Sequence, residues 1–318
     1  MSSIPISELA DATIRHLIAA LESLTDGELA VDILIACGRR TVPFLSQVLL
    51  DSPPQSIAVS RCRVVRALGG LGEKHILLQY LRDWKHPTDP AVTMAEDAVR
   101  SAAAKELLRW PSQEVFDVLM VCVRERASLG LVEALGAFDR AEAIPVLFQV
   151  LQDDICGNAA KEMLRRTSEH TKAFALQLLA ASSLEGEQAP STLRMLRSTL
   201  ALLLGMKVSK TEWASISHLL DRADAEIVIT CAEIGMRSAP AKEHRAIVSH
   251  IFRILPNCNW LQESRAIELL ELCKPLARSA ARTKRDELIN SGSKPNLLNP
   301  VWRMIDTQAA WKGKNNVA

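Results

Sequence analysis

Aromatic side chains are scarce in this sequence: it has one Tyr and six Phe, and Phe, Trp and Tyr together make up 4% of its 318 residues. β-Sheet proteins usually draw more heavily on aromatic residues and Thr, whereas Leu, Ala, Ile and Val dominate here, which favours helices. The apolar share of 48% is enough to build a continuous core. That share argues against disorder over most of the chain.

Cysteine pairs and long apolar runs are also missing. The seven cysteines are far apart and never spaced as C-x-x-C, so neither a zinc site nor a redox motif is indicated. Most lie in apolar stretches, as buried free thiols do in a reducing compartment. The first residues lack the basic start and apolar run of a signal peptide. The longest apolar run, Leu200–Met206, is too short to span a bilayer. We therefore expect a cytoplasmic protein without a membrane span.

No sequence motif of catalysis or cofactor binding occurs. The chain has no H-E-x-x-H, no His-Glu dipeptide, no P-loop, no G-x-S-x-G and no G-x-G-x-x-G. Gly69, Gly70 and Gly72 follow an apolar helical stretch, where they are expected to end a helix. We predict no catalytic residue, no metal site and no cofactor.

Charge is nearly balanced, at a formal net value of +1. Such a balance gives no general attraction to nucleic acids or anionic membranes. It is uneven along the chain, because residues 282–318 carry seven basic and three acidic side chains, a net charge of +4.

An internal repeat is the strongest pattern present. Several apolar stretches end on a leucine-like residue followed by a glycine or a basic residue, and the second member of each pair serves as a frame mark. The frame marks are Gly38, Gly69, Leu108, Gly136, Arg165, Gly205 and Gly235, at intervals of 31, 39, 28, 29, 40 and 30 residues. The two long intervals contain Pro- or Gly-bearing segments at 84–90 and 182–190, which read as loops inserted into a unit of about 30 residues.

Each unit is predicted to contain two helices. Helical apolar spacing marks first helices at Thr41–Leu50, Ala141–Leu151 and Ser209–Leu220. An aspartate stands at or just after the end of the predicted first helices: Asp51, Asp83, Asp153 and Asp221. Second helices are predicted at Ile57–Leu68, Pro90–Leu108, Ser128–Leu135, Cys156–Leu164, Pro190–Leu204 and Ala223–Ile234. Asp89 before Pro90 is a typical helix start.

The segment Val99-Arg100-x-x-Ala103-Ala104-x-x-Leu107, the Val-Val-Arg-Ala-Leu-Gly at 64–69 and the turn aspartates resemble HEAT repeats. The short unit is most similar to the variant in phycobilin-lyase-like proteins. The resemblance covers residues 25–240 and continues in degenerate form to 290. It implies an all-α fold, a right-handed α-solenoid of about seven to eight antiparallel helix pairs. Tetratricopeptide and ankyrin arrays have similar periods, but their sequence patterns are absent.

The resemblance also implies a ladder between turn aspartates and the Val-Arg arginine. Asp51 with Arg61, and Asp97 or Asp83 with Arg100, match its positions. Ser128 and Cys156 stand where arginines would be expected and interrupt the ladder.

Three regions are predicted. Residues 1–25 form an N-terminal capping helix (Ser7–Leu24), and residues 26–290 form the repeat solenoid. Residues 291–318 form a linker and a short amphipathic segment, Val301–Trp311. Trp302, Ile305 and Ala309 share one helical face of that segment, which suits docking on the last repeat or on a partner.

Two sets of charged residues are candidates for partner binding. The first set lies three residues before successive frame marks, and we call it the charged column: Arg66, Lys105, Glu133 and Glu162. In HEAT repeats the second helices line the concave face, so the resemblance places this column there. A column that is basic and then acidic would orient a charge-asymmetric partner; the alternative is ordinary solvated surface. Basic residues follow most frame marks and form the second set, the basic ridge: Arg39, Lys74, Arg109, Arg140, Lys207 and Arg237. Cations are also favoured at helix C-termini by the helix dipole, without any ligand.

The sequence thus predicts a non-enzymatic scaffold or adaptor that binds a protein or peptide on its concave surface. One alternative is a nucleic-acid-binding or DNA-glycosylase-like HEAT protein, whose chemistry needs an Asp beside stacked Trp residues. Four tryptophans are instead expected to pack at repeat junctions: Trp84, Trp110, Trp213 and Trp260. Another alternative is a lyase-like accessory protein, for which no residue set can be carried over. The oligomeric state stays open.

Overall fold

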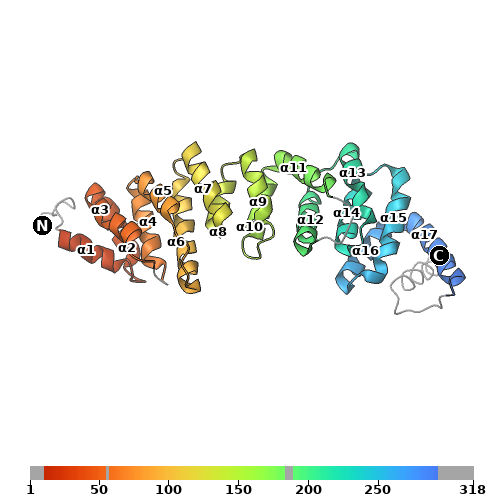
Figure 1. Ribbon diagram of the computed structural model, residues 1–318, viewed down its shortest axis with the longest axis horizontal. Helices are drawn as coiled ribbons and strands as arrows, with labels where there is room; N and C mark the ends of the chain where they lie inside the picture. Colours follow the sequence, from red (N-terminus) through yellow and green to blue (C-terminus); the bar gives the residue numbers. More distant parts are fainter. Residues whose placement is uncertain (1–10, 55–56, 183–188, 293–318) are drawn as a thin grey trace, which may run out of the picture. The chain divides into compact units, whose positions relative to one another are not determined.

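The computed structural model describes residues 11–54, 57–182 and 189–292, and in them every regular element is a helix (Figure 1). This confirms the prediction of an all-helical chain. None of the helices in this part of the chain is long and apolar enough to cross a membrane. The first ten residues of the predicted capping segment lie outside the described residues. So do the amphipathic segment Val301–Trp311 and nearly all of the linker before it.

The chain folds into two compact units, Met1–Thr167 and Ser168–Ala318. Unit 1 contains α1 (Asp11–Ala20), α2 (Gly27–Ala36), η2 (Gly38–Thr41), α3 (Val42–Ser46), η3 (Gln47–Asp51), α4 (Val59–Gly70), α5 (Lys74–Asp83), α6 (Pro90–Leu107), α7 (Gln113–Glu125), α8 (Leu129–Gly136), η4 (Ala141–Ala143), α9 (Ile144–Val150) and α10 (Gly157–Arg166).

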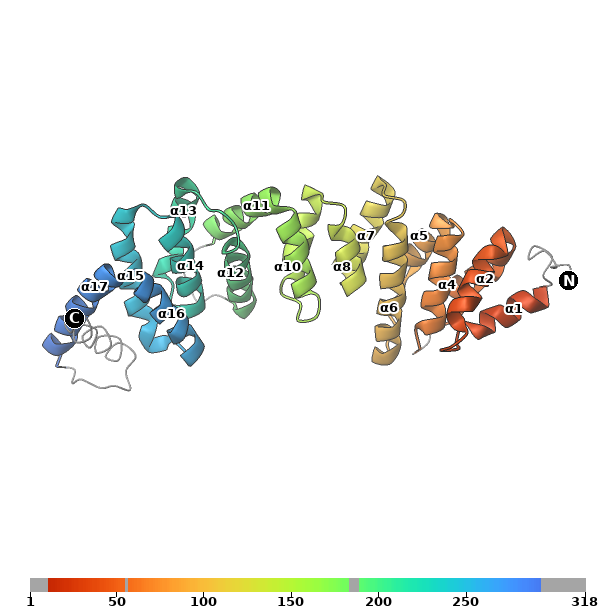
Figure 2. The same ribbon diagram turned by 180° about the vertical axis from the view of Figure 1, so that it is seen from behind.

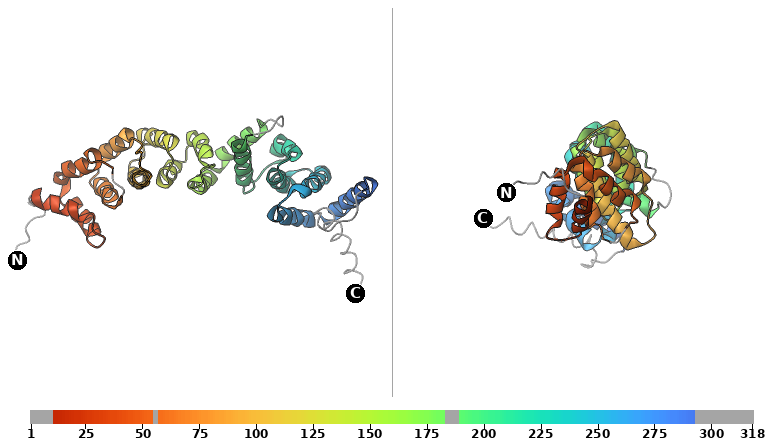
Figure 3. Two further views of the ribbon diagram at one scale, coloured as in Figure 1. Left: turned by 60° about the horizontal axis from the view of Figure 1, so that its bottom comes forward. Right: turned by 90° about the vertical axis from the view of Figure 1, so that its left-hand side faces the viewer.

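The helices of unit 1 form two layers. In one, α2, α4, α6, α8 and α10 each pack on the next, and we call this the second-helix layer (Figures 1 and 2). In the other, α5 packs on α7 and α7 on α9, so that two rows of helices are visible in the left view of Figure 3. Each helix of the second-helix layer therefore contacts the next helix of the same layer.

The six predicted second helices are confirmed with small shifts at their ends. The segment expected at Pro90–Leu108 is α6, which starts as predicted: the Asp89 carboxylate accepts hydrogen bonds from the amides of Ala91 and Val92 at 2.7 and 3.3 Å. By contrast, none of the three predicted first helices is a single α-helix. Thr41–Leu50 is divided into η2, α3 and the π-turn η3. Ala141–Leu151 is divided into η4 and α9, and Ser209–Leu220 into α13 (Lys210–Ile216) and the 3-10 helix η5 (Ser217–Asp221).

Close approach of α6 and α8 depends on a glycine. A Cβ added at Gly130 would lie 2.5 Å from the Cβ and 2.8 Å from the Cα of Ser101, closer than real Cβ contacts allow. The Ser101 and Ser128 hydroxyls are hydrogen-bonded at 2.9 Å beside this contact. Because Ser101 offers backbone atoms there, the two helices would have to move apart to accept a side chain.

We expect Gly130→Ala to lower the free energy of unfolding by about 1–3 kcal/mol, since overpacking outweighs the better helix propensity of Ala. Urea denaturation followed by circular dichroism measures the change. Gly205→Ala is the matched control, because a Cβ there would meet its nearest atom at 3.7 Å. A Gly130 variant as stable as the control variant would contradict the close approach.

Buried arginines replace part of the predicted ladder. Arg61 does not reach Asp51, which is exposed; it forms an ion pair with Glu96 at 2.9 Å and donates to the Leu49 carbonyl at 2.9 Å. The prediction was wrong because a carboxylate from the next repeat, on α6, lies inside the core beside Arg61. The side chains of Arg61 and Glu96 are 5% and 2% exposed, and the Tyr80 hydroxyl also donates to Glu96, at 2.7 Å.

Arg100 ties α6 to the end of α7. Its guanidinium is fully buried, lies 3.8 Å from the ring centroid of Trp84, and donates to the carbonyls of Cys122 and Arg126 at 3.2 and 3.4 Å. Of its two predicted partners, the nearer is Asp97, at 3.6 Å. Asp97 is itself bound more tightly by Arg126, at 2.8 Å.

Unit 2 contains α11 (Ser168–Ala180), α12 (Pro190–Leu203), α13 (Lys210–Ile216), η5 (Ser217–Asp221), α14 (Ala225–Ser238), η6 (Ala241–Glu243), α15 (His244–Ile254), η7 (Leu255–Asn257), α16 (Trp260–Leu272) and α17 (Lys274–Asn290). Here too α12, α14 and α16 pack in succession. Arg253 caps the end of η5 by donating to the carbonyls of Asp221 and Arg222, both at 3.0 Å.

Three of the four tryptophans that were predicted to pack are at least partly buried, and the fourth is exposed. Trp213 is 1% exposed and donates to Glu243 at 2.8 Å, Trp84 lies against Arg100, and Trp110 is partly buried. Trp260 was predicted to pack as well, but its side chain is 81% exposed at the first position of α16. A first-turn residue can point away from the core, which the position near a helix end does not reveal.

Candidate interaction surface

Most members of the charged column are engaged in ion pairs. Arg66 on α4 donates to Glu28 on α2 at 2.6 Å, and Lys105 on α6 pairs with Glu133 on α8 at 3.0 Å. Hydrogen bonds from Arg66 and Arg63 lower the pKa of Glu28. The column changes from basic to acidic residues between Lys105 and Glu133, and these two residues form a salt bridge between α6 and α8. The column members stay 38–56% exposed in these pairs.

Glu162 continues the column on α10. Its nearest cation is Arg166 on the same helix, at 3.9 Å, and its side chain is 55% exposed. At that distance and exposure the attraction is weak. Glu162 is thus available to a partner more fully than the other column residues.

Exposed apolar side chains lie on the same helices as this column or in the turn before them. They stand at the start of each second helix or in the turn before it, with exposed fractions of 40, 73, 49 and 82%: Val59, Met94, Leu129 and Ile155. Val59 precedes Arg66 by seven residues, Met94 precedes Lys105 by eleven, and Leu129 precedes Glu133 by four. All three spacings bring both residues to one side of a helix.

These apolar residues also come together across repeats. Met94, Leu129 and Ile155 line one cavity of about 540 Å³, with Ser101 and Ser128 on its wall. We call Val59, Met94, Leu129 and Ile155 together with the charged column the mixed face. The apolar members were not predicted from the sequence, although each is an apolar residue outside the buried stripe of its helix, and this pattern is a signal that identifies them.

The basic ridge does not present a row of free cations. Within unit 1, Arg109 pairs with Glu106 at 3.0 Å, Lys74 with Glu114 at 3.2 Å, and Arg140 with Glu142 at 2.9 Å. Lys207 is exposed and belongs to unit 2, whereas Arg109 belongs to unit 1. Cations that are already paired with carboxylates attract the phosphate groups of a nucleic acid only weakly.

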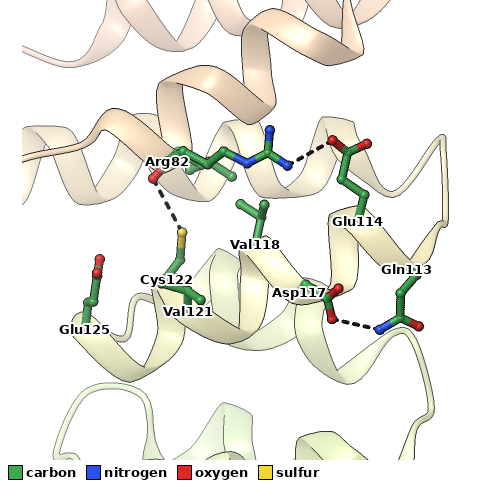
Figure 4. A pocket seen from close by; sticks show the side chains of 9 residues that line it. Arg82, Gln113, Glu114, Asp117, Val118, Val121, Cys122 and Glu125 are labelled. Carbon is green, nitrogen blue, oxygen red and sulfur yellow. Dashed lines mark hydrogen bonds and ion pairs between the residues drawn. The ribbon is translucent and has the colours of Figure 1, made fainter.

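A groove between α5 and α7 is a second concave feature (Figure 4). Its volume is about 570 Å³, and its floor is apolar, formed by Leu81, Val118, Val121 and Cys122. One wall is formed by Arg82, which donates to Glu114 at 2.9 Å. Hydrogen bonds from Arg82 and Lys74 lower the pKa of Glu114, so this carboxylate is compensated by cations.

The described residues contain no cluster of three His, Cys, Asp or Glu side chains that could hold a metal ion. Burial raises the pKa of the Cys122 thiol, and of Cys156 and Cys258 to about 11 each. Thiols with such pKa values are protonated at neutral pH and are poor nucleophiles.

In the part of the chain that the structure describes, every regular element is helical, and apolar and charged side chains together line one groove and one cavity of unit 1. No protein-family model, no curated protein and no solved structure matches the chain.

Proposed function

We propose that the chain is a HEAT-like repeat solenoid that serves as a non-enzymatic scaffold and binds a protein or peptide partner on the mixed face. The observation that carries this proposal is the joint placement of exposed apolar and charged side chains on α4, α6 and α8, which pack in succession. In a HEAT solenoid this layer would line the concave surface.

Interface energetics support the combination of residues. Protein interfaces draw most of their affinity from a few apolar anchors that fill pockets, while charged residues around them give orientation and specificity. Met94 and Ile155 are 73 and 82% exposed, and they share a cavity into which a partner side chain fits. A partner with apolar residues flanked by charges complementary to the column would bury them.

The first test asks whether the apolar residues bind a partner. Proteins captured from native cells on immobilised protein are identified, and the dissociation constant of the most enriched partner is measured. We expect Met94→Asp/Ile155→Asp to weaken binding by about tenfold or more, because burying a carboxylate opposes association. Leu272→Asp is the matched control, since Leu272 is 81% exposed in unit 2.

A charge swap separates binding from folding. Lys105→Glu/Glu133→Lys preserves the ion pair between α6 and α8 but inverts its direction. If the column orients a partner, the swap weakens binding while the melting temperature stays unchanged. Equal binding by parent, swap and apolar variants would reject the mixed face. A partner that proves to be nucleic acid would reject the scaffold proposal itself.

A further inference from the structure

On its α7 side, the groove between α5 and α7 is lined by an acidic, an apolar and an acidic side chain in a row. Asp117, Val121 and Glu125 follow one another at intervals of four residues, so they lie on one side of the helix. All three are exposed, and Val121 retains 50% of its surface although it is apolar. An apolar patch is thus bracketed by two carboxylates.

In the described part of the chain, neither Asp117 nor Glu125 takes part in an ion pair, in contrast to Glu114 beside them. Asp117 accepts a hydrogen bond from the neutral amide of Gln113 at 2.7 Å, as Figure 4 shows.

Asp117 is held in position by a chain of contacts. Arg140 donates to the side-chain amide oxygen Oε1 of Gln113 at 2.6 Å, which leaves the side-chain nitrogen Nε2 of Gln113 to face Asp117. Arg140 itself lies 4.2 Å from the ring centroid of Phe116. The carboxylate is therefore oriented without being neutralised. An oriented carboxylate at the rim of an apolar groove is suited to a basic ligand.

We propose that this groove binds an extended segment of a partner protein in which a large apolar residue stands between two basic residues, at positions i, i+2 and i+4. Residues four apart on a helix are separated by about 6 Å along its axis. Residues two apart in an extended peptide are separated by about 6.7 Å and point to the same side. A basic, apolar, basic pattern therefore matches Asp117, Val121 and Glu125 in order.

Charge argues against other occupants. The lining contains three carboxylates, Glu114, Asp117 and Glu125, against one cation, Arg82. Nucleic acids and acidic peptides would be repelled. The groove lies between α5 and α7 of the other layer, and Glu125 at its end also lines the cavity of the mixed face.

The test uses fluorescein-labelled peptides and anisotropy with the full chain. We expect the peptide GKSLSKG to bind saturably and more weakly with added salt. The peptides GKSSSKG and GESLSEG are expected to bind at least about fivefold more weakly, through loss of the apolar contact and of the charge contacts respectively. Spermidine, which supplies charge without the apolar residue, should compete poorly.

Variants place the binding in the groove. Asp117→Asn/Glu125→Gln should weaken GKSLSKG binding about fivefold or more, and Val121→Ser should do so as well. Glu22→Gln/Asp32→Asn makes the same charge change at exposed positions of unit 1 and should leave binding unchanged. A GKSLSKG peptide carrying a photo-crosslinker should label α7. Equal affinity in parent and groove variants, labelling elsewhere, or equal binding of GESLSEG would overturn the proposal.

Discussion

Replacing Arg61 with Met is expected to lower the free energy of unfolding by about 3–5 kcal/mol, because the change strands a carboxylate inside unit 1. The Arg61–Glu96 pair is 2.9 Å long, and its side chains are 5% and 2% exposed. Without the guanidinium, the Glu96 carboxylate stays in the core with the Tyr80 hydroxyl still donating to it. A buried charge that loses its counter-ion costs far more than the intact pair contributes.

Two companion variants make this expectation specific. Arg61→Met/Glu96→Gln removes both charges and keeps an acceptor for Tyr80, so it should recover most of the loss. Lys105→Met/Glu133→Gln removes a pair of almost the same length, 3.0 Å, whose side chains are 56% and 38% exposed. That exposed pair should change stability by no more than about 1 kcal/mol.

Urea denaturation gives the free energies, and hydrogen exchange read by mass spectrometry locates the weakened helices. Exchange should rise in α4 and α6, which Arg61 and Glu96 join. If the stability loss of Arg61→Met/Glu96→Gln equals the sum of the losses of Arg61→Met alone and Glu96→Gln alone, the two groups are not energetically coupled.

How far the sequence predicts this fold can be judged from the frame marks. Lys105 and Glu133 stand at the same offset from Leu108 and Gly136, and the structure pairs them across α6 and α8. Equivalent positions in stacked repeats are neighbours, so the repeat alone was enough to predict that these side chains lie close together. Helix starts such as Asp89–Pro90 were predictable because the signal lies within the first turn.

The partners of buried charges were not predictable in the same way. Asp51 is ten residues from Arg61, whereas its actual partner Glu96 is 35 residues away. Which carboxylate enters the core depends on how α4 and α6 rotate about their axes, and no local pattern encodes this. The exposure of Trp260 and Met94 was missed for a related reason, since hydrophobicity indicates burial only when the helix face is known.

Buried arginines connect the core to the proposed function. Arg61 and Arg100 are anchored on α4 and α6, the helices that carry Val59, Arg66, Met94 and Lys105 on their exposed sides. A change in the rotation of either helix would separate the members of the mixed face. The positions of exposed residues therefore depend on contacts on the opposite side of the same helices.

Replacing Arg100 with Met is the second change expected to have a large effect, lowering the free energy of unfolding by about 2–4 kcal/mol. The guanidinium is fully buried, satisfies the carbonyls of Cys122 and Arg126, and lies against the ring of Trp84. Met fills much of the same volume but donates no hydrogen bond, so both carbonyls at the end of α7 lose this donor.

The loss should be smaller than that of Arg61→Met, because no carboxylate is stranded. Asp97 keeps two hydrogen bonds from Arg126 Nε and one from Nη2, the last at 2.8 Å. Arg285→Met is the matched control: its side chain is 47% exposed and pairs with Asp286, which is 61% exposed, so about 0.5 kcal/mol is the most we expect. Hydrogen exchange should accelerate at the C-terminal turn of α7 in Arg100→Met and stay unchanged there in Arg285→Met. Unchanged protection of that turn in the Arg100 variant would mean that its carbonyls do not depend on the guanidinium, and the capping role would be rejected.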